Sequence, residues 1–332
     1  MSEYLLDVQD LHTSFFTDAG EVQAVNGVSF HLDPGEILGI VGESGSGKSV
    51  TAYSIMQILA DTGRIVGGRI LYKGDDLSKF SEKQMQKFRG KSCSIIFQDP
   101  MTSLNPVFTI GSQLKEAVVL HTDKRGKEAD ERVIELLELV GINEPQKRVK
   151  QYPFEHSGGM RQRVMIAMAL ACEPDILIAD EPTTALDVTI QAQILELIQE
   201  LQLKLGMAVI LVTHDLGVIA SMCDNVVVMY GGRICERGTA SEIFYHPKHE
   251  YTKGLLRSIP NVNNMKERLV PIAGTPINML NLPKGCSFCA RCDNAMKICL
   301  DRVPEELEIN ENHKASCWMN VKQAFEEGGA AV

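Results

Sequence analysis

The chain has 332 residues, 44% of them hydrophobic and 23% charged, and a formal net charge of −10. This composition is ordinary for a soluble globular protein, and the length allows a large core and two domains. The acidic balance argues against a nucleic-acid-binding protein, whose surface normally carries a basic stripe.

No segment approaches the roughly 18 consecutive apolar residues that a membrane-spanning helix needs. The first residues, Met1 to Tyr4, do not begin a charged-then-apolar signal peptide. We therefore expect a cytosolic chain that reaches a membrane only through partner proteins.

The first 60 residues predict several strands followed by one helix. Residues 4–33 alternate apolar and polar in short runs that break at 18–20 and 33–35, which is typical of antiparallel strands. Residues 37–41 are continuously apolar, which predicts a strand buried on both faces. A glycine-rich loop follows, and then a helix over about 48–59. A phosphate-binding loop requires this order of strand, loop and helix.

The glycine-rich loop matches the phosphate-binding pattern G-x-x-x-x-G-K-[ST] at every fixed position. Its glycines let backbone N–H groups face phosphate oxygens, and the start of the next helix adds positive charge. Lys48 supplies a charge to the β- and γ-phosphates, and the Ser49 hydroxyl can bind Mg²⁺. The alternative is a chance glycine turn, against which the flanking strand and helix argue. The predicted nucleotide contacts are Gly42, Ser44, Gly45, Ser46, Gly47, Lys48, Ser49 and Val50.

The middle of the chain alternates helical stretches with short apolar runs, which predicts an α/β fold with a parallel sheet. From about residue 105 to 172 the sequence is mostly helical, with apolar residues at helical spacing between Val133 and Val140. The expected strands are 94–97, 176–179, 208–212 and 226–229, the later helices are about 188–205 and 215–222, and a tight hairpin lies at 230–233.

Polar side chains follow three of these predicted strands. Asp180 would hold Mg²⁺, and Glu181 would act as the general base on the attacking water. His214 could donate a hydrogen bond to the γ-phosphate, and Gln98 could sense Mg²⁺ and the water. Taken singly, an acidic strand end meeting solvent or a structural histidine would explain each residue as well.

Beyond about residue 250 prolines become frequent and the periodicity weakens. Five of the nine cysteines fall in this last part of the chain. We expect a nucleotide-binding domain over 1–250, with a helical subdomain over about 105–172, and a small Cys-rich domain over 251–332. The clustered cysteines are Cys286, Cys289, Cys292, Cys299 and Cys317.

The order of these motifs resembles the ABC transporter ATPase family over about residues 4–245. The motifs are the phosphate loop, Gln98, the signature segment Ser157-Gly158-Gly159-Met160-Arg161-Gln162, Asp180-Glu181, Leu186-Asp187 and His214. The resemblance implies a P-loop NTPase fold with an antiparallel β subdomain and a helical subdomain. It also implies hydrolysis of ATP by Glu181, His214 and Gln98. Mg²⁺ would be bound by Ser49, Gln98 and Asp180.

In this family two such domains dimerise head to tail, so each ATP is held between one phosphate loop and the other chain's signature segment. A helix start with glycines presents free N–H groups to an anion, which suits this arrangement. The resemblance therefore implies that the partner's ATP is contacted in trans by Ser157, Gly158, Gly159 and Asp187.

Two positions need separate interpretation. The residue before Ser157 is often leucine in the family, and His156 stands there in this chain. We expect His156 to be a solvent-facing neutral change, with a pH-sensing role as the alternative. Family members also stack an aromatic side chain on adenine, and we predict Phe15 for this role. Phe16 is the alternative, and either ring could belong to the core.

Residues 98–106, 161–169 and 187–193 further resemble the ATPases of bacterial dipeptide and oligopeptide importers. This subgroup also includes nickel and glutathione importers. The resemblance implies two membrane permease subunits, faced by Asp99 to Pro106, and an extracytoplasmic substrate-binding protein. It implies a second ATPase that is a related chain rather than a second copy, no nucleic acid, and a peripheral position at the cytoplasmic face of the membrane.

The C-terminal cysteines also resemble the tail of these ATPases, where four cysteines bind a [4Fe–4S] cluster. By matching positions the implied ligands are Cys286, Cys292, Cys299 and Cys317, with Cys289 additional and a structural or docking role for the cluster. Thiolates close in sequence also suit a Cys₄ zinc site, or one that recruits His313. Free thiols are the remaining alternative.

Two other functions compete with peptide import. A soluble ABC ATPase acting on DNA or ribosomes tends to carry two cassettes or long coiled coils, whereas this chain has one cassette. A non-catalytic scaffold would not need the complete set of Lys48, Asp180, Glu181 and His214.

Overall fold

The computed structural model describes residues 4–99, 103–184, 186–258 and 271–321. Its residues form two compact units that each draw on separate parts of the sequence. The first unit comprises residues 1–32, 37–78 and 212–332, and the second comprises 33–36 and 79–211.

The first unit contains an antiparallel sheet with the strand order β2-β1-β4-β5. Leu6 of the central strand pairs with Leu32 on one side and Tyr72 on the other, and all three side chains are buried. The predicted antiparallel strands near the N-terminus are thus confirmed. The strands are β1 (Leu6–Thr17), β2 (Gly20–Leu32), β4 (Gly63–Tyr72) and β5 (Asp75–Asp76).

The same unit holds a run of strands in the order β11-β12-β10-β9-β3. β3 (Ile37–Val41) is buried throughout and pairs in parallel with β9 (Asn225–Tyr230). The predicted hairpin is confirmed, because Tyr230 of β9 pairs with Arg233 at the start of β10 (Arg233–Thr239).

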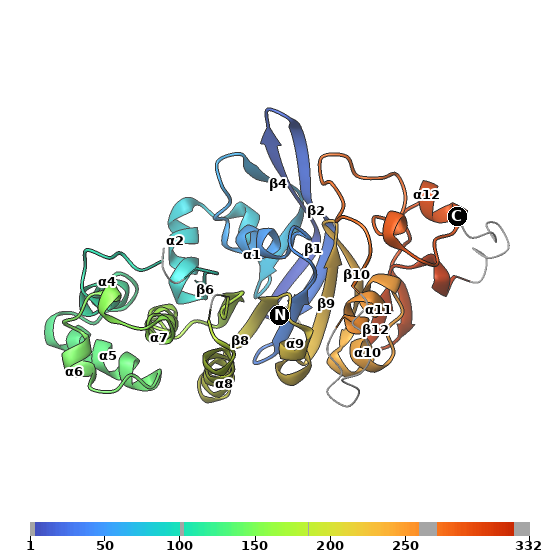
Figure 1. Cartoon of the computed structure of the whole chain (residues 1–332). Helices are drawn as coiled ribbons and strands as arrows, with labels where there is room; N and C mark the ends of the chain where they lie inside the picture. The colour runs from blue at the N-terminus through green and yellow to red at the C-terminus, as the bar shows by residue number, and fades with distance from the viewer. Residues whose placement is uncertain (1–3, 100–102, 185, 259–270, 322–332) are drawn as a thin grey trace. The chain divides into compact units, whose positions relative to one another are not determined.

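The C-terminal residues contribute two strands to this sheet. β12 (His313–Ala315) pairs antiparallel with β10, and β11 (Leu307–Asn310) pairs with β12 (Figure 1). Sequence reasoning missed both strands, because each is only a few residues long and depends on the sheet edge that β10 offers.

The helices of the first unit begin with α1 (Lys48–Met56), which is shorter than predicted. Its end is set by Gln57, whose left-handed φ of 49° closes the helix. The remaining helical segments are α9 (Leu216–Met222), α10 (Ala240–Tyr245), α11 (Glu250–Arg257), η3 (Cys289–Arg291), α12 (Lys297–Asp301) and η4 (Trp318–Asn320).

The second unit holds the other predicted core strands, in the order β8-β7-β6. β6 (Cys93–Ile96) and β7 (Ile176–Asp180) run parallel, and β7 and β8 (Ala208–Thr213) are wholly buried. The chain passes from the second unit to the first within β8. The predicted parallel strands are confirmed.

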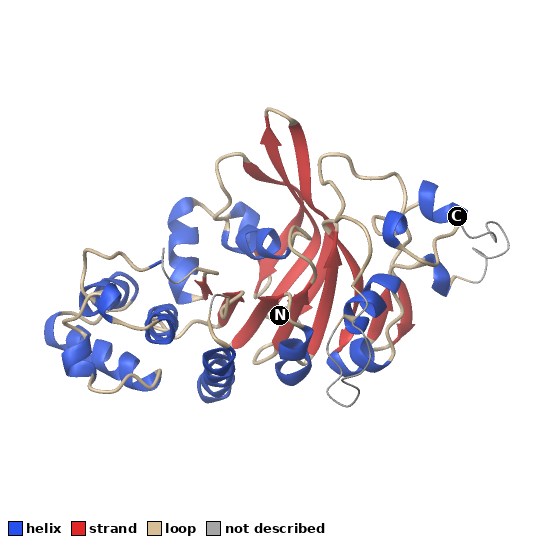
Figure 2. Cartoon of the chain, viewed as in Figure 1, coloured by secondary structure: helices blue, strands red, loops and turns tan. Residues whose placement is uncertain are grey.

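A group of helices with no strand among them confirms the predicted helical insertion (Figure 2). The apolar stripe from Val133 to Val140 is buried as its spacing predicts. Helical segments of this unit are α2 (Glu82–Lys91), α4 (Ile110–His121), α5 (Gly126–Leu139), α6 (Pro145–Arg148), η2 (Pro153–Glu155), α7 (Gly158–Ala169) and α8 (Val188–Leu205), while η1 (Leu77–Lys79) lies where the chain enters the unit.

None of the helices in the described part of the chain has the length and apolar character that crossing a bilayer requires.

Candidate active site

The phosphate loop connects β3 to α1 in the first unit. The Lys48 side chain lies inside the loop, with the residue 4% exposed. Its Nζ donates to the carbonyl oxygens of Gly42 at 2.8 Å and Glu43 at 3.1 Å. Gly47 is the N-cap of α1 and has no side chain, so no side-chain oxygen of the N-cap accepts from the first-turn N–H groups of the helix. A cation and a helix start thus share one concave loop, which suits an anionic ligand.

Two glycines of the loop have no room for a side chain. Gly47 has a φ of 101°, and a Cβ there would lie 2.4 Å from the Ala24 carbonyl oxygen. A Cβ on Gly42 would lie 2.2 Å from the Met229 carbonyl oxygen. The loop is therefore pressed against the neighbouring backbone, and this contact fixes its shape.

Ser46 adds a polar group that matches a phosphate ligand. The residue is 4% exposed, and its Oγ has no hydrogen-bond partner among the described residues. Its carbonyl oxygen accepts from the Gly232 N–H at 3.0 Å, so the backbone is held in place. A buried hydroxyl without a partner is costly, and a phosphate oxygen would satisfy it.

The acidic pair lies in the second unit, at the end of β7. Asp180 is fully buried, and Glu181 adopts a left-handed φ of 45°, which is unusual for a residue with a side chain. Glu181 Oε2 accepts from Gln98 Nε2 at 2.9 Å and from Thr184 Oγ1 at 3.0 Å. These two donors fix the direction of the carboxylate, as a general base requires. Thr184 was not predicted as a site residue.

The parallel pairing of β6 and β7 explains why Gln98 meets Glu181. Ile96 pairs with Ala179, so both strands end at the same edge of the sheet. The polar residues that follow the two strands are therefore neighbours, although 83 positions separate them in sequence. This neighbourhood agrees with the predicted roles of Gln98 and Glu181, which stay predictions.

The signature segment begins α7 in the same unit. Ser157 is the N-cap, and its Oγ accepts from the Met160 N–H at 3.3 Å. Asp187 caps α8 in the same way, accepting from the Ile190 N–H at 3.0 Å. A Cβ on Gly159 would lie 2.8 Å from the Ile190 side chain, so the two helix starts are packed together. Both capping residues are exposed, as contact with a partner's nucleotide would require.

His156 is not solvent-facing, and this expectation was wrong. The residue is 4% exposed, and neither ring nitrogen has a hydrogen-bond partner among the described residues. Burial, together with the nearby Arg148 and Arg161, lowers the pKa of His156 below its usual value. The ring is therefore buried without hydrogen bonds and remains neutral near pH 7.

The remaining predicted nucleotide contacts belong to the first unit. His214 is exposed just beyond the end of β8. Phe15 is half-buried and its ring lies against Gly63 of β4, while Phe16 is 47% exposed. Phe16 thus offers the more accessible ring, and the choice between the two for adenine stays a prediction.

The C-terminal cysteines gather around a small buried cluster formed by Met296 and Cys299. Burial raises the pKa of both Cys286 and Cys292 to about 12, and the neighbouring Cys299 and Cys317 add to this effect. These thiols are therefore protonated at neutral pH unless a metal displaces their protons.

The thiols of this cluster are donors that suit iron or zinc, but their arrangement does not form a metal site. In the part of the chain that the structure describes, no three His, Cys, Asp or Glu side chains are arranged to hold a metal ion. His313 does not serve as the alternative zinc ligand. Its ring nitrogens lie 2.7 Å from Glu236 and 3.2 Å from Glu242, so both are engaged by carboxylates.

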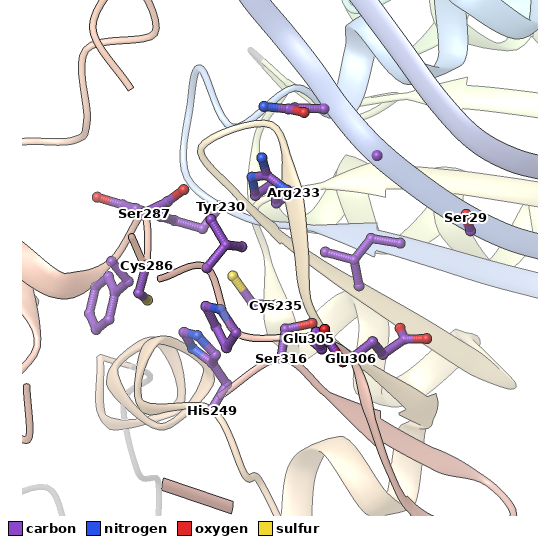
Figure 3. Close-up of a pocket in the computed structure, with 16 residues that line it drawn as sticks. Ser29, Tyr230, Arg233, Cys235, His249, Cys286, Ser287, Glu305, Glu306 and Ser316 are labelled. Atoms are coloured by element: carbon purple, nitrogen blue, oxygen red, sulfur yellow. The ribbon is translucent and has the colours of Figure 1, made fainter. Parts of the chain in front are cut away.

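A cavity of about 410 Å³ lies beside the cysteine cluster. It is lined by residues of β2, β9 and β10 and by the segment that carries Cys286 (Figure 3). Cys235 and Tyr230 lie on its wall, while Arg233 and Glu306 bring charges of both signs. Such a mixed lining favours no single class of ligand.

Sequence reasoning missed two side chains that hold the phosphate loop. The Glu43 N–H donates to the Tyr251 hydroxyl at 2.7 Å, and the Glu43 carboxylate pairs with Arg291. Tyr251 follows the last cassette motif and Arg291 lies among the C-terminal cysteines, and nothing near either residue in the sequence signals a contact with Glu43.

Comparison with known proteins finds transporter families that match the N-terminal and the C-terminal parts of the chain. Residues 25–184 match the ABC transporter family, and residues 235–299 match the C-terminal region of oligopeptide/dipeptide transporters. The chain is 55% identical to the dipeptide transport ATP-binding protein DppD of Bacillus subtilis, over 97% of this chain and 96% of that protein. It is 49% identical to the oligopeptide transport ATP-binding protein OppD of Escherichia coli, over 97% and 95% respectively.

Solved structures share the fold. A dimeric ATP-binding cassette in a post-hydrolysis state bound to ADP and Pi superposes with a TM-score of 0.64 at 25% identity. That match covers 71% of this chain and 98% of the cassette. A second match is cbiO1 of Clostridium perfringens, with a TM-score of 0.63 at 31% identity, covering 74% and 92%.

Proposed function

This chain belongs to the ATP-binding subunits of ABC transporters, in the dipeptide and oligopeptide group, and from that premise we propose that it hydrolyses ATP to drive peptide import. The observation that carries the proposal is the extent of the likeness. It covers almost the whole length of the peptide-transport relatives and includes their C-terminal region as well as the cassette.

The phosphate loop binds the triphosphate in this proposal. Lys48 exchanges its two carbonyl acceptors for phosphate oxygens, and Ser46 gains the partner that it lacks within the chain. Charge-assisted bonds to phosphate are stronger than bonds to neutral carbonyls, so the exchange favours binding. Mg²⁺, held by Ser49, Gln98 and Asp180, would neutralise charge on the phosphates.

Glu181 is the general base. Its carboxylate, directed by Gln98 and Thr184, accepts a proton from water as the water attacks the γ-phosphate. His214 donates a hydrogen bond to the γ-phosphate. The bond from the β,γ-bridging oxygen to the γ-phosphorus breaks, and ADP and phosphate leave.

The active assembly is a dimer with a second, related ATPase. The exposed N-terminal ends of α7 and α8 would contact the nucleotide bound by that partner, through Ser157 and Asp187. The likeness to a dimeric cassette supports this arrangement.

Two permease subunits dock on the second unit, at the cytoplasmic face of the membrane. The surface we assign to them combines exposed apolar side chains that follow Gln98 with two stacked rings before α7. Val107 and Phe108 are 70% and 52% exposed, and the rings of Tyr152 and Phe154 stack 5.5 Å apart. Part of the predicted surface, residues 100–102, lies outside the described residues. An extracytoplasmic binding protein would deliver the peptide.

Glu181→Gln tests the hydrolytic proposal. It keeps the shape of the side chain but removes the base, so ATP turnover should fall by about 10²-fold or more while ATP binding persists. Glu200→Gln, on the exposed face of α8, is the matched control and should keep normal turnover. Turnover unchanged in Glu181→Gln would rule out Glu181 as the base.

The same variant tests the transport proposal, because it should trap the ATP-bound dimer. Tagged Glu181→Gln protein, purified from detergent-solubilised cells with ATP, should bring down two integral membrane proteins and a second ATPase. Vesicles holding the wild-type assembly should then take up a labelled dipeptide when ATP is supplied. Recovery of ribosomes or DNA-repair factors, with no membrane protein, would overturn the transport proposal.

We further propose that the cysteine cluster binds a [4Fe–4S] group with a structural role, with Zn²⁺ as the competing metal. The ligands would be Cys286, Cys292, Cys299 and Cys317, whose side chains would have to move closer together, because among the described residues they are not arranged to hold a metal. Anaerobically purified protein should contain iron and acid-labile sulfide. Cys299→Ser should lose them and Cys289→Ser should not. Stoichiometric zinc, or no metal, would overturn the cluster.

A further inference from the structure

The segment that carries the C-terminal cysteines reaches the phosphate loop directly. Arg291 lies between Cys289 and Cys292, and its side chain is only 5% exposed. Arg291 Nη1 donates to Glu43 Oε2 at 2.6 Å, and Nη2 donates to Glu43 Oε1 at 3.0 Å. This is a two-point ion pair, the geometry in which arginine holds a carboxylate most firmly.

All five N–H groups of the Arg291 guanidinium have acceptors. Besides the two bonds to Glu43, Nε donates to the Ala273 carbonyl oxygen at 2.9 Å and Nη2 to that of Ile272 at 3.3 Å. The remaining Nη1 hydrogen faces the Tyr230 hydroxyl at 3.3 Å. A lysine could not make this set of contacts, so the site is built for arginine.

Aromatic side chains hold the guanidinium in position. The rings of Tyr230 and Phe288 have their centroids 5.7 and 5.9 Å from Arg291 Cζ. Tyr251 packs against both rings and is itself fully buried. Because Tyr251 also accepts from the Glu43 N–H, one packed group supports both sides of the ion pair.

Glu43 in turn positions the lysine of the loop. Its carbonyl oxygen accepts from Lys48 Nζ at 3.1 Å and from the Ser46 N–H at 3.2 Å. Any shift of Glu43 would therefore move the groups that face phosphate. In addition, an uncompensated Glu43 carboxylate would repel a triphosphate, and the Arg291 charge cancels that repulsion.

We propose that Arg291 is a positioning residue for the nucleotide site, through which the Cys-rich segment sets the affinity of the phosphate loop for ATP. This inference rests on the proposed ATPase function. It assigns the C-terminal segment a role inside the nucleotide site of its own chain. Because coupling between two sites is reciprocal, ATP should also stabilise the segment around residues 286–292.

The test measures ATP affinity of the full-length purified chain, in the Glu181→Gln background so that hydrolysis does not interfere. R291A should weaken ATP binding by about tenfold or more, since it leaves a partly buried carboxylate unpaired beside the ligand. R291K keeps the positive charge but loses the two-point hydrogen bonding of the guanidinium. Its ATP affinity should therefore lie between those of R291A and the parent. If R291A does not fold by circular dichroism, R291K carries the test.

The decisive variant is the double variant that combines E43Q with R291A. Removing the carboxylate removes the repulsion, so the double variant should bind ATP more tightly than R291A alone. A purely structural role for Arg291 would give no such rescue, because E43Q restores no packing or docking contact. E43Q by itself loses one of the two bonds to Arg291, because an amide nitrogen cannot accept from the guanidinium, so it should weaken ATP binding less than R291A does.

Arg237 gives a matched control within the same unit. It forms a similar two-point pair with Glu306, with distances of 2.8 and 2.6 Å, and also joins β10 to the C-terminal region. R237A should leave ATP affinity unchanged, because this pair does not touch the phosphate loop.

The outcomes separate the two proposals. Failure of the parent chain to bind ATP would overturn the ATPase function itself. If the parent binds ATP, equal affinities of R291A and parent would overturn only the Arg291 proposal. An equal loss of ATP affinity in R291A and R237A would also overturn only the Arg291 proposal. So would an R291A variant whose ATP affinity does not rise when E43Q is added. Hydrogen exchange over residues 286–292 should slow with ATP in the parent and not in R291A.

Discussion

Replacing His156 with leucine should stabilise the second unit. The His156 ring is buried and both of its nitrogens lack partners among the described residues. A buried polar group without a hydrogen bond costs about 1–3 kcal/mol. Leucine has no polar group to satisfy, and side chains of similar volume are tolerated in cores at a cost below about 1.5 kcal/mol. We therefore expect a net gain of about 1–2 kcal/mol in the free energy of unfolding.

The gain should depend on pH in a defined direction. Burial and nearby arginines lower the pKa of His156 below its ordinary value of 6.5. A base with a lowered folded pKa contributes stability that is present above 6.5 and is lost as the pH falls further. Leucine does not titrate, so the advantage of His156→Leu should grow as the solution becomes more acidic.

Urea unfolding at pH 8 and at pH 5.5, followed by circular dichroism, measures both effects. The control is His246→Leu, at an exposed position, where the change should stay within about 0.5 kcal/mol. ATP turnover should be retained, because Ser157 and the glycines of the signature segment are untouched. Lower stability of His156→Leu at both pH values would refute the reasoning and indicate that the ring nitrogens are satisfied by buried water.

Three further predictions follow from the site geometry. Gly47→Ala should abolish tight ATP binding in a fluorescence titration, because its Cβ would lie 2.4 Å from a backbone oxygen; Gly45→Ala, with no heavy atom within 4 Å, should lose less. Gln98→Ala should lower ATP turnover by about 10²-fold, as loss of a positioned hydrogen bond does elsewhere; normal turnover would show that the 2.9 Å bond to Glu181 is not needed. Burial lowers the pKa of His249 from 6.5 to about 4, so wild-type stability should drop by about 3 kcal/mol as the pH falls from 6.5 to 4, and His249→Asn should remove most of that drop in urea unfolding.

The parts of the candidate site whose local structure could be expected from the sequence are those where one local rule decides the backbone. The phosphate loop needs positive φ and close backbone contact at Gly47, which only glycine permits, so the pattern itself carries the geometry. Gln98 and Glu181 follow parallel strands, and such strands end at a common edge, so their meeting could be inferred without coordinates. The relatives then confirm the family that these motifs indicated.

The parts that sequence reasoning missed depend on contacts between distant segments. β4 contains Gly63, Gly67 and Gly68, which weaken the strand pattern, and it forms because β1 offers a pairing edge. His156 is buried although its side chain is polar, and nothing beside it in the sequence signals this. Arg291 meets Glu43 across 248 positions, and nothing near either residue signals the contact.

The hydrogen bonds of Lys48 explain why the phosphate loop depends on groups outside its own motif. In the proposed binding step, Lys48 Nζ leaves the carbonyl oxygens of Gly42 and Glu43, which help to hold the loop closed in the free chain. A loop held only by those bonds would lose its shape as the ligand enters, and reordering it would cost affinity. Here the Glu43 backbone stays bound to Tyr251 and its side chain to Arg291, and neither contact competes with phosphate. The loop can therefore release its lysine without losing its shape.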